Sequence, residues 1–515
     1  MTRTLRIMGR FIVADFLERV RRYSFFVTML AGVYLGYTVN AGYIVIYLGN
    51  YCGEYNSAWV GTLVALASAV FISLVGFYIV KNSVDRDRRT RVGQIIAATP
   101  VGKFTYLLSK TLSNFLVLSA IVGIQVIAAV AMLLLSPQNP GFEIWKLLSP
   151  FLLITLPALI FVAALAVLFE SIMWLSGGLG NIVYFFLIEA LLIIPLVSGV
   201  KDFDHLFIRE VEASMHESAL AAYPEFDGGF TLQAGPRMDD ARGGVKTFAW
   251  EGISWTPGLI VRRLSWYLLA FLVTALAVPF FDRFDEATVQ KKAWRRKPGA
   301  PEKESRISRV VTTLTRIRLQ SRSGRLLVAE LRLMLRGLHR AWYIAALGFV
   351  IAGCFSPADA VKHPLLAITW IWPVLVWSKM GMREEYYGTG QLIFTAPGIG
   401  LRQLLASWGA GIIVTLLTGI GAGMNLLAAG DWQAVAGFGA ALMFIPALAL
   451  AFGAVSGGSK LFEATYVIWW YLGPMNDTPA LDFTGMSSDA GTSAGYAAFA
   501  LVCVGVAYAA RRRVA

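Results

Sequence analysis

GQIIAATP at residues 93–100 and GQLIFTAP at residues 390–397 are two copies of one motif, far apart in this chain. Each copy is preceded at the same offset by an arginine and an acid, Arg86-Asp87 and Arg383-Glu384. The charges between the acid and the motif differ, but the Gly-Gln pair and the closing proline persist. A repeated shape in a changed charge context indicates an internal repeat rather than a shared composition.

Two further motifs occur twice in the same order. RFIVAD at 10–15 matches RLLVAE at 325–330, and SGG at 176–178 recurs at 456–458. All three matches are collinear and fall at equivalent points of the hydropathy pattern. We therefore expect two homologous halves, 1–281 and 325–515, joined by a basic linker at 282–324.

Apolar runs fill most of the chain between these motifs. Apolar residues make up 57% of the sequence, and its mean hydropathy is +0.62. A soluble globular chain has about 45–50% apolar residues. A membrane-spanning helix needs about 20 apolar residues in a row. Runs of that order predict six spans in the first half, near 24–43, 59–80, 112–135, 147–169, 178–199 and 259–281. Shorter or similar runs predict six more, near 341–356, 363–380, 402–429, 434–455, 461–475 and 492–510. The predicted fold class is all-α, a polytopic membrane protein with twelve transmembrane helices as two six-helix repeats.

Basic residues in short loops face the cytoplasm. Six arginines precede the first run, whereas residues 44–58 contain no Lys or Arg. Residues 282–325 hold thirteen basic residues against five acids, and the chain closes on three arginines. By contrast, 201–257 carries ten acids against five bases, and 476–489 has acids alone. We expect both termini in the cytoplasm of a bacterial plasma (inner) membrane, with 201–257 and 476–489 outside. Arg262 and Arg263 do not fit this alternation, and we expect them to snorkel at the outer mouth of the sixth span.

An amphipathic segment precedes the first span of each half. One face carries Leu5, Met8, Ile12 and Phe16 in the first half, and Leu327, Leu331, Met334 and Leu338 in the second. With arginines on the other face, each segment is expected to lie along the cytoplasmic leaflet. The alternative is a simple helical extension of the span.

The loops at 85–100 and 382–397 follow the second span of each half. Residues 85–100 are too polar to enter the bilayer, and Pro100 closes a segment that is otherwise compatible with a helix. We expect a short cytoplasmic helix. Retention of Gly-Gln and of the proline in both loops indicates that they meet related partner surfaces. The alternative is a positive-inside loop whose similarity arose by chance.

This layout resembles the permease of the second type of ABC exporter, in which six spans per half follow an interfacial helix. The resemblance covers nearly the whole chain, although both halves are fused here and the first external segment is much longer. It implies that the loop after the second span couples to the ATPase. The implied coupling residues are Asp85, Arg86, Gly93, Gln94 and Pro100 in the first half, and Arg383, Glu384, Gly390, Gln391 and Pro397 in the second.

No phosphate-binding loop of the form GxxxxGK[ST] occurs in the sequence. This chain is therefore expected to be no enzyme and to bind no cofactor, with ATP and magnesium on partner subunits. Two copies of an ABC ATPase are expected, because each half offers one docking loop. The expected substrate is a hydrophobic or amphipathic small molecule, a lipid or a peptide. No nucleic acid partner is expected, and the spacing of His205, His216 and Glu217 matches no metal site.

Glu189 and Glu463 are the clearest charges inside predicted spans. A charge at the centre of a span costs about 2.5–3.5 kcal/mol on insertion scales, so each is a candidate for a substrate path. Satisfaction by a neighbouring helix is the alternative. A proton-coupled transporter of the major facilitator type also has twelve spans and a basic second loop. The two amphipathic segments, the long external loop and the scarcity of charges inside spans favour the exporter instead.

Overall fold

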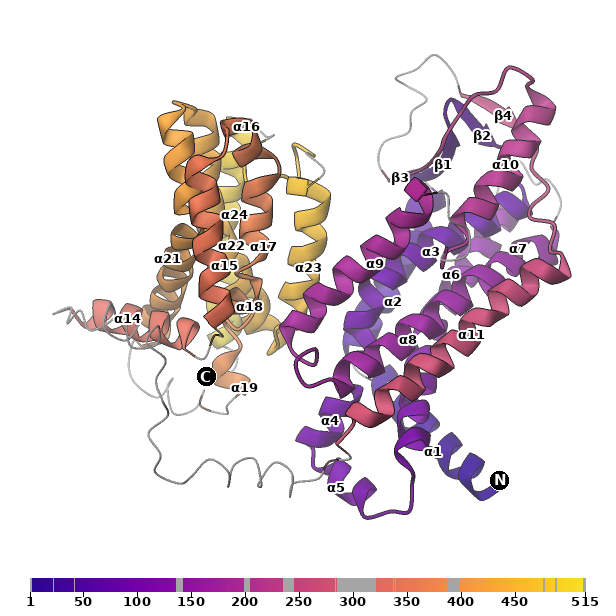
Figure 1. Ribbon diagram of the computed structural model, residues 1–515, viewed down its shortest axis with the longest axis horizontal. Helices are drawn as coiled ribbons and strands as arrows, with labels where there is room; N and C mark the ends of the chain where they lie inside the picture. The colour runs from indigo at the N-terminus through magenta and orange to yellow at the C-terminus, as the bar shows by residue number, and fades with distance from the viewer. Residues whose placement is uncertain are drawn as a thin grey trace. The chain divides into compact units, whose positions relative to one another are not determined.

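The computed structural model describes residues 2–21, 23–40, 42–135, 142–198, 204–234, 245–282, 284, 321–336, 338, 340–386, 389, 399–475, 478–486 and 489–512. The chain divides into two compact units, Met1–Ala293 and Trp294–Ala515 (Figure 1). The boundary falls within the stretch 282–324 that was predicted to link two halves.

Helices make up most of the first unit. They are α1 (Thr2–Val20), α2 (Tyr23–Asn40), α3 (Ser57–Val80), α4 (Ser83–Arg89), α5 (Val92–Ala97), α6 (Lys103–Leu135), α7 (Ile144–Pro150), the π-helix η1 (Phe151–Thr155), α8 (Leu156–Ser171), α9 (Gly178–Ser198), α10 (Ile208–Ala222), α11 (Pro257–Ala277) and the 3₁₀-helix η3 (Val278–Phe280).

The described part of the second unit is also helical. It contains α14 (Arg322–Leu335), α15 (Arg340–Phe355), α16 (Ala358–Ala360), the π-helix η4 (Val361–Leu365), α17 (Leu366–Ile371), α18 (Val374–Trp377), α19 (Arg383–Tyr386), α21 (Ile399–Ala428), α22 (Trp432–Ser456), α23 (Lys460–Trp470), the π-helix η5 (Tyr471–Met475) and α24 (Ala490–Arg512).

Eight helices within the described residues are long and apolar enough to cross a membrane. They are Ser57–Arg88, Lys103–Ala131, Ile144–Ser171, Pro257–Phe280, Ala358–Trp377, Gly400–Ala428, Trp432–Ser456 and Ala490–Arg511. The chain is therefore a multi-pass helical membrane protein. The other four predicted spans coincide with α2, α9, α15 and α23, which have 18, 21, 16 and 11 residues. The count of twelve spans in two repeats stays a prediction.

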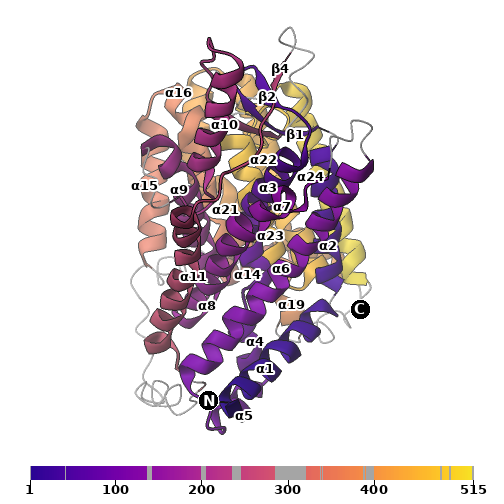
Figure 2. The ribbon, with the colours of Figure 1, turned by 90° about the vertical axis from the view of Figure 1, so that its right-hand side faces the viewer.

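The same pairs of elements pack in each unit. In the first unit α1 and α2 pack on α6, α6 packs on α8, and α8 packs on α11. In the second unit α14 and α15 pack on α21, α21 packs on α22, and α22 packs on α24. Figure 2 shows α1 running alongside α6. These contacts follow the same order along the chain in both units.

A small sheet in the first unit departs from the predicted all-α class. Its strands are β1 (Ile44–Leu48), β2 (Tyr51–Gly53), β3 (Phe230–Ala234) and β4 (Lys246–Phe248), in the order β3-β1-β2-β4. β1 runs antiparallel to β3 and to β2, and β2 runs parallel to β4. The sheet joins the connection between α2 and α3 to the segment 201–257, which was predicted to be external. Hydropathy did not reveal it, because the strands are short and because β1 and β2 pair with β3 and β4, which lie far along the sequence.

The expectation that Arg262 and Arg263 both snorkel is wrong for Arg263, whose residue is only 1% exposed. Its Nε donates to the carbonyl oxygen of Leu153 at 2.6 Å, and its Nη2 donates to that of Ile154 at 3.1 Å. The guanidinium also donates to the carbonyls of Asp204 at 3.3 Å and His205 at 2.9 Å. Leu153 and Ile154 belong to the π-helix η1, so Arg263 joins this bulge to the start of the external segment.

Arg262 points elsewhere and pairs with Glu210 of α10 at 2.6 Å. Two adjacent arginines therefore have different environments, which their sequence positions did not distinguish.

The connection between α23 and α24 also differs from a solvated external loop. Asp482, Phe483 and Thr484 are each at most 2% exposed. The Asp482 carboxylate accepts a hydrogen bond from the Thr484 amide at 2.9 Å. Gly485 lies against Gly437 of α22 so closely that a Cβ on Gly485 would be 2.3 Å from the Gly437 Cα. This loop is packed into the helices of the second unit.

Candidate functional site

A buried ion cluster joins three elements of the first unit. Arg86 of α4 contacts Asp15 of α1, with 2.6 Å between Nη2 and Oδ1. Lys110 of α6 lies 2.8 Å from Asp15 Oδ2 and 2.7 Å from Asp87 Oδ2. The hydroxyl of Tyr106, also on α6, donates to Asp87 Oδ2 at 2.8 Å. We name these five residues the first cluster.

The charges of the first cluster balance, with two carboxylates against one guanidinium and one ammonium. Burial by itself raises the pKa of the Asp15 carboxyl, but Lys110, Arg19 and Arg86 lower it, and the net result is a pKa below the usual range. Asp15 is therefore ionised at neutral pH. Because each buried charge depends on its partners, removing one leaves the others uncompensated.

A corresponding cluster joins elements of the second unit. Arg383 of α19 approaches Glu330 of α14, with 3.5 Å between Nη1 and Oε2. The amide of Gln403 on α21 donates to Glu384 at 2.8 Å and to Glu330 at 3.3 Å. Arg511 of α24 lies 3.4 Å from Glu384. We name these five residues the second cluster.

The two clusters are built from the repeated motifs. Asp15 and Glu330 are the last residues of RFIVAD and RLLVAE. Arg86-Asp87 and Arg383-Glu384 precede the octapeptides GQIIAATP and GQLIFTAP. Tyr106 and Gln403 each lie six residues after the proline of their octapeptide, and each donates to the equivalent acid. Motifs that are distant in sequence thus recur together because they contact each other within each unit.

Sequence reasoning missed several members of the clusters. Tyr106 and Gln403 could have been found from their equal distance from the repeated proline. They were missed because their residue types differ. Lys110 and Arg511 carried no such signal, since they come from different helices and are not equivalent positions. Arg511 had been assigned only to the positive-inside charge at the end of the chain.

Glu170 at the end of α8 fixes the start of the first loop. Its carboxylate accepts hydrogen bonds from the amides of Ser83 at 3.0 Å, Val84 at 2.6 Å and Asp85 at 3.3 Å. These amides are the unpaired donors at the N-terminus of α4, where a carboxylate is favourable. The amide of the predicted coupling residue Asp85 is therefore held inside the unit.

In the second unit, glycines allow the backbone just before α19 to pack closely on α22. Gly381 has a φ of +75°, and a Cβ there would lie 2.5 Å from the carbonyl oxygen of Leu450. A Cβ on Gly453 would lie 1.9 Å from the carbonyl oxygen of Met380. Direct backbone packing against α22 thus replaces the carboxylate cap.

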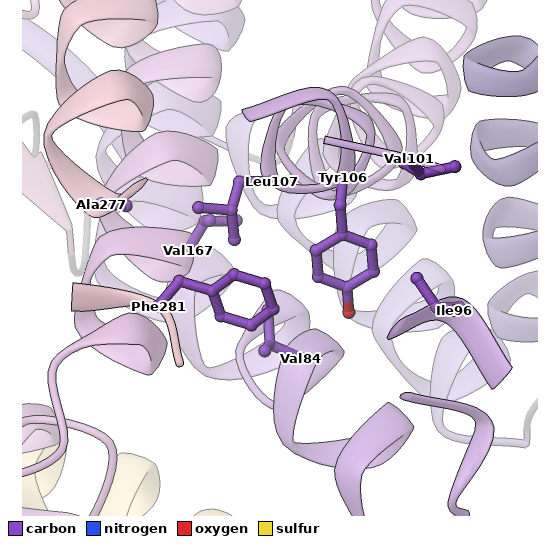
Figure 3. Close-up of a cluster of buried hydrophobic side chains, with 8 residues drawn as sticks. All are labelled: Val84, Ile96, Val101, Tyr106, Leu107, Val167, Ala277 and Phe281. Carbon is purple, nitrogen blue, oxygen red and sulfur yellow. The ribbon is translucent and has the colours of Figure 1, made fainter. Parts of the chain in front are cut away.

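Helix α5 has one buried and one exposed face. Gly93 and Ile96 are buried, and Ile96 belongs to the apolar cluster of Figure 3 together with Tyr106 and Phe281. The Phe281 ring stacks on the Tyr106 ring at 5.3 Å between centroids. On the other face, Ile95 is 70% exposed.

Replacing Gly93 by alanine should destabilise the first unit by about 1–3 kcal/mol, as overpacking does. An added Cβ would lie 2.5 Å from the ring of Phe284, which packs on Tyr106. Alanine favours helix, so a net loss must come from this contact. Gly102→Ala is the matched control, because its Cβ would meet nothing closer than 3.9 Å. The measurement is the thermal unfolding midpoint of the purified chain, and equal midpoints for the two variants would contradict the prediction.

The remaining predicted coupling residues are only partly placed. Gln94 and Pro100 are exposed. Gly390, Gln391 and Pro397 lie outside the described residues. Gly93 is retained at a tight intramolecular contact, so its repetition has a cause besides a partner surface.

Glu189 on α9 and Glu463 on α23 are both buried, and both have interaction partners. Their assignment to a substrate path stays a prediction. Among the described residues, no group of three or more His, Cys, Asp or Glu side chains is arranged to hold a metal ion.

Comparison of the chain with protein families, with curated proteins and with solved structures finds no match. Its function is therefore inferred from its own sequence and geometry.

Proposed function

We propose that this chain is the membrane-spanning permease of an ATP-driven exporter, similar to the second type of ABC exporter permease. Two separate ATPase subunits would dock on the loops at 85–100 and 382–397 and carry ATP and magnesium. The observation that carries the proposal is the pair of corresponding clusters. In each unit a cluster joins the loop after the second predicted span to the amphipathic helix and to the third predicted span.

The first cluster gives the loop a mechanical role. Arg86 and Asp87 of α4 are bound by Asp15 and Lys110 of two other helices, and Glu170 binds the start of α4 from a third. Separating buried opposite charges costs several kcal/mol. A force on α4 and α5 would therefore move these helices together rather than bend the loop. Such a rigid connection is what alternating access driven by a docked ATPase requires.

The exposed face of α5 supplies the contact in this proposal. Val92 is 43% and Ile95 is 70% exposed, while Arg88 and Arg91 are exposed beside them. An apolar centre with a charged rim is the usual composition of a protein interface. With the loops in the cytoplasm, both termini are also cytoplasmic, in a bacterial inner membrane. The substrate class is a hydrophobic or amphipathic small molecule, a lipid or a peptide.

The first test is copurification of the tagged chain from its native membrane in mild detergent, followed by mass spectrometry. An ATPase subunit with a phosphate-binding loop should coelute at about two copies per chain, one for each docking loop. Ile95→Asp should release the subunit docked on the first loop, because a charge would enter the apolar centre of the contact. Leu220→Asp is the control, since Leu220 is an exposed leucine on α10, outside the docking loops.

Two outcomes oppose the proposal. A chain that is reproducibly alone and transports with a proton gradient is a secondary transporter of the major facilitator type, with Glu189 or Glu463 as the candidate proton carrier. An ATPase that stays bound to the Ile95→Asp variant docks elsewhere than on α5.

A further inference from the structure

Helix α14 presents a row of arginines on the face turned away from its unit. Arg322, Arg325 and Arg336 are exposed. At 3.6 residues per turn Arg322 and Arg325 fall about 60° apart on the helix, and Arg336 is the C-cap residue that follows it. Leu333 lies on the same face and is 57% exposed. This face combines positive charge with an exposed apolar side chain.

The opposite face of α14 is occupied by its own unit. Met334 is buried, and Glu330 belongs to the second cluster. Leu327 packs against Gly409 of α21, where an added Cβ would lie 2.7 Å from Leu327 Cδ1. Leu327 and Met334 were predicted to face the cytoplasmic leaflet of the membrane, and they instead contact protein. The arginine face remains for another partner.

Helix α1 has the same arrangement. Arg6, Arg10 and Arg21 are exposed, with exposed Val13 and Leu17 between them on one face. Its acids point elsewhere, because Asp15 belongs to the first cluster and Glu18 pairs with Arg86. Glu330 is the one acid in α14. Among the described residues of the two helices, the face that carries the arginines is therefore positive and carries no acid of its own helix.

The position of the two helices defines the surroundings of these faces. α1 packs on α6 and α14 packs on α21, and both partners are long enough to span a membrane. α14 runs across the direction of α15 and α21 near their ends (Figure 1). A helix beside the end of a span lies at the level of the lipid headgroups.

We propose that α1 and α14 bind anionic phospholipid headgroups through these arginine faces. Guanidinium groups bind phosphate with two parallel hydrogen bonds, and exposed Val13, Leu17 and Leu333 enter the boundary of the acyl chains. The packing of α1 and α14 on helices long enough to span a membrane favours a lipid surface over an acidic protein as the partner of these faces. This inference concerns the lipid alone and does not depend on an ATPase partner.

The test uses the full chain in detergent, titrated with phosphatidylglycerol or phosphatidylcholine, with bound lipids counted by native mass spectrometry. Phosphatidylglycerol should bind more tightly, and its binding should weaken as salt rises from about 0.1 M to 1 M. Two triple variants should each bind phosphatidylglycerol more weakly. One combines Arg6→Gln, Arg10→Gln and Arg21→Gln, and the other combines Arg322→Gln, Arg325→Gln and Arg336→Gln. The expected loss is about fivefold for each arginine removed.

Three comparisons make the result specific. Arginine-to-lysine versions of the triple variants keep the charge and should keep most of the binding. Arg88→Gln with Arg91→Gln removes exposed charges from the loop instead and should change it little. Equal binding of the two lipids by the unaltered chain, no salt dependence, or full binding by the glutamine variants would overturn the proposal. Binding of an acidic protein but not of phosphatidylglycerol would overturn it as well.

Discussion

Arg86→Gln is expected to lower the stability of the first unit by about 3–5 kcal/mol, the usual loss when one member of a buried ion pair is removed. The Arg86 side chain contacts both Asp15 and Asp87 and is 17% exposed. Its removal leaves the carboxylates of Asp15, Asp87 and Glu18 with two cations, Lys110 and Arg19, of which Arg19 lies 4.0 Å from Asp15. Thermal unfolding of the purified chain measures the loss. If the exporter proposal holds, ATP hydrolysis by the docked subunits should also become independent of substrate.

Arg383→Gln is the matched control in the second unit. Arg383 lies 3.5 Å from Glu330, and the Gln403 amide also donates to that carboxylate. The remaining hydrogen bond should limit the loss to about 1–2 kcal/mol. Asp15→Asn in the Arg86→Gln background should restore part of the stability, because it removes the uncompensated charge. The prediction is contradicted if Arg86→Gln and Arg383→Gln lower the stability equally and Asp15→Asn restores none of it. The first cluster would then contribute no net pairing energy.

Arg263→Met should prevent stable folding of the first unit. The substitution keeps an unbranched side chain but removes hydrogen bonds to the carbonyls of Leu153, Ile154, Asp204 and His205. An unsatisfied buried acceptor costs about 1–3 kcal/mol, so four together approach the whole stability of a domain. The amount of monodisperse protein recovered from membranes, and its unfolding midpoint, measure the effect.

The neighbouring Arg262→Met serves as control for Arg263→Met. Arg262 pairs with Glu210 in a partly exposed position, and such pairs contribute at most about 1 kcal/mol. This variant should fold normally. Comparable recovery of the two variants would mean that water or relaxed backbone replaces the Arg263 hydrogen bonds.

The repeated Arg86-Asp87 and Arg383-Glu384 were predicted to belong to loops that couple to an ATPase, and this role stays a prediction. Their side chains bind helices of their own units, which the sequence did not indicate. A repeat shows that positions are constrained together, without showing whether the constraint is internal or external. Two residues of α5 illustrate the two kinds of constraint. Ile95 is exposed and faces outward, whereas Gly93 is buried and packs on Phe284 of its own unit.

The sequence by itself determined the helical membrane class, the positions of the long apolar helices and the existence of repeated motifs. These properties follow from local hydropathy and spacing, which each segment carries independently of the rest. Only the tertiary structure decided that Lys110 and Arg511 complete the clusters, that Arg263 is buried while Arg262 is not, and that β1 pairs with β3. Each of these depends on which distant segments come into contact, and the burial of a charge is set by its neighbours in space rather than by its neighbours in the chain.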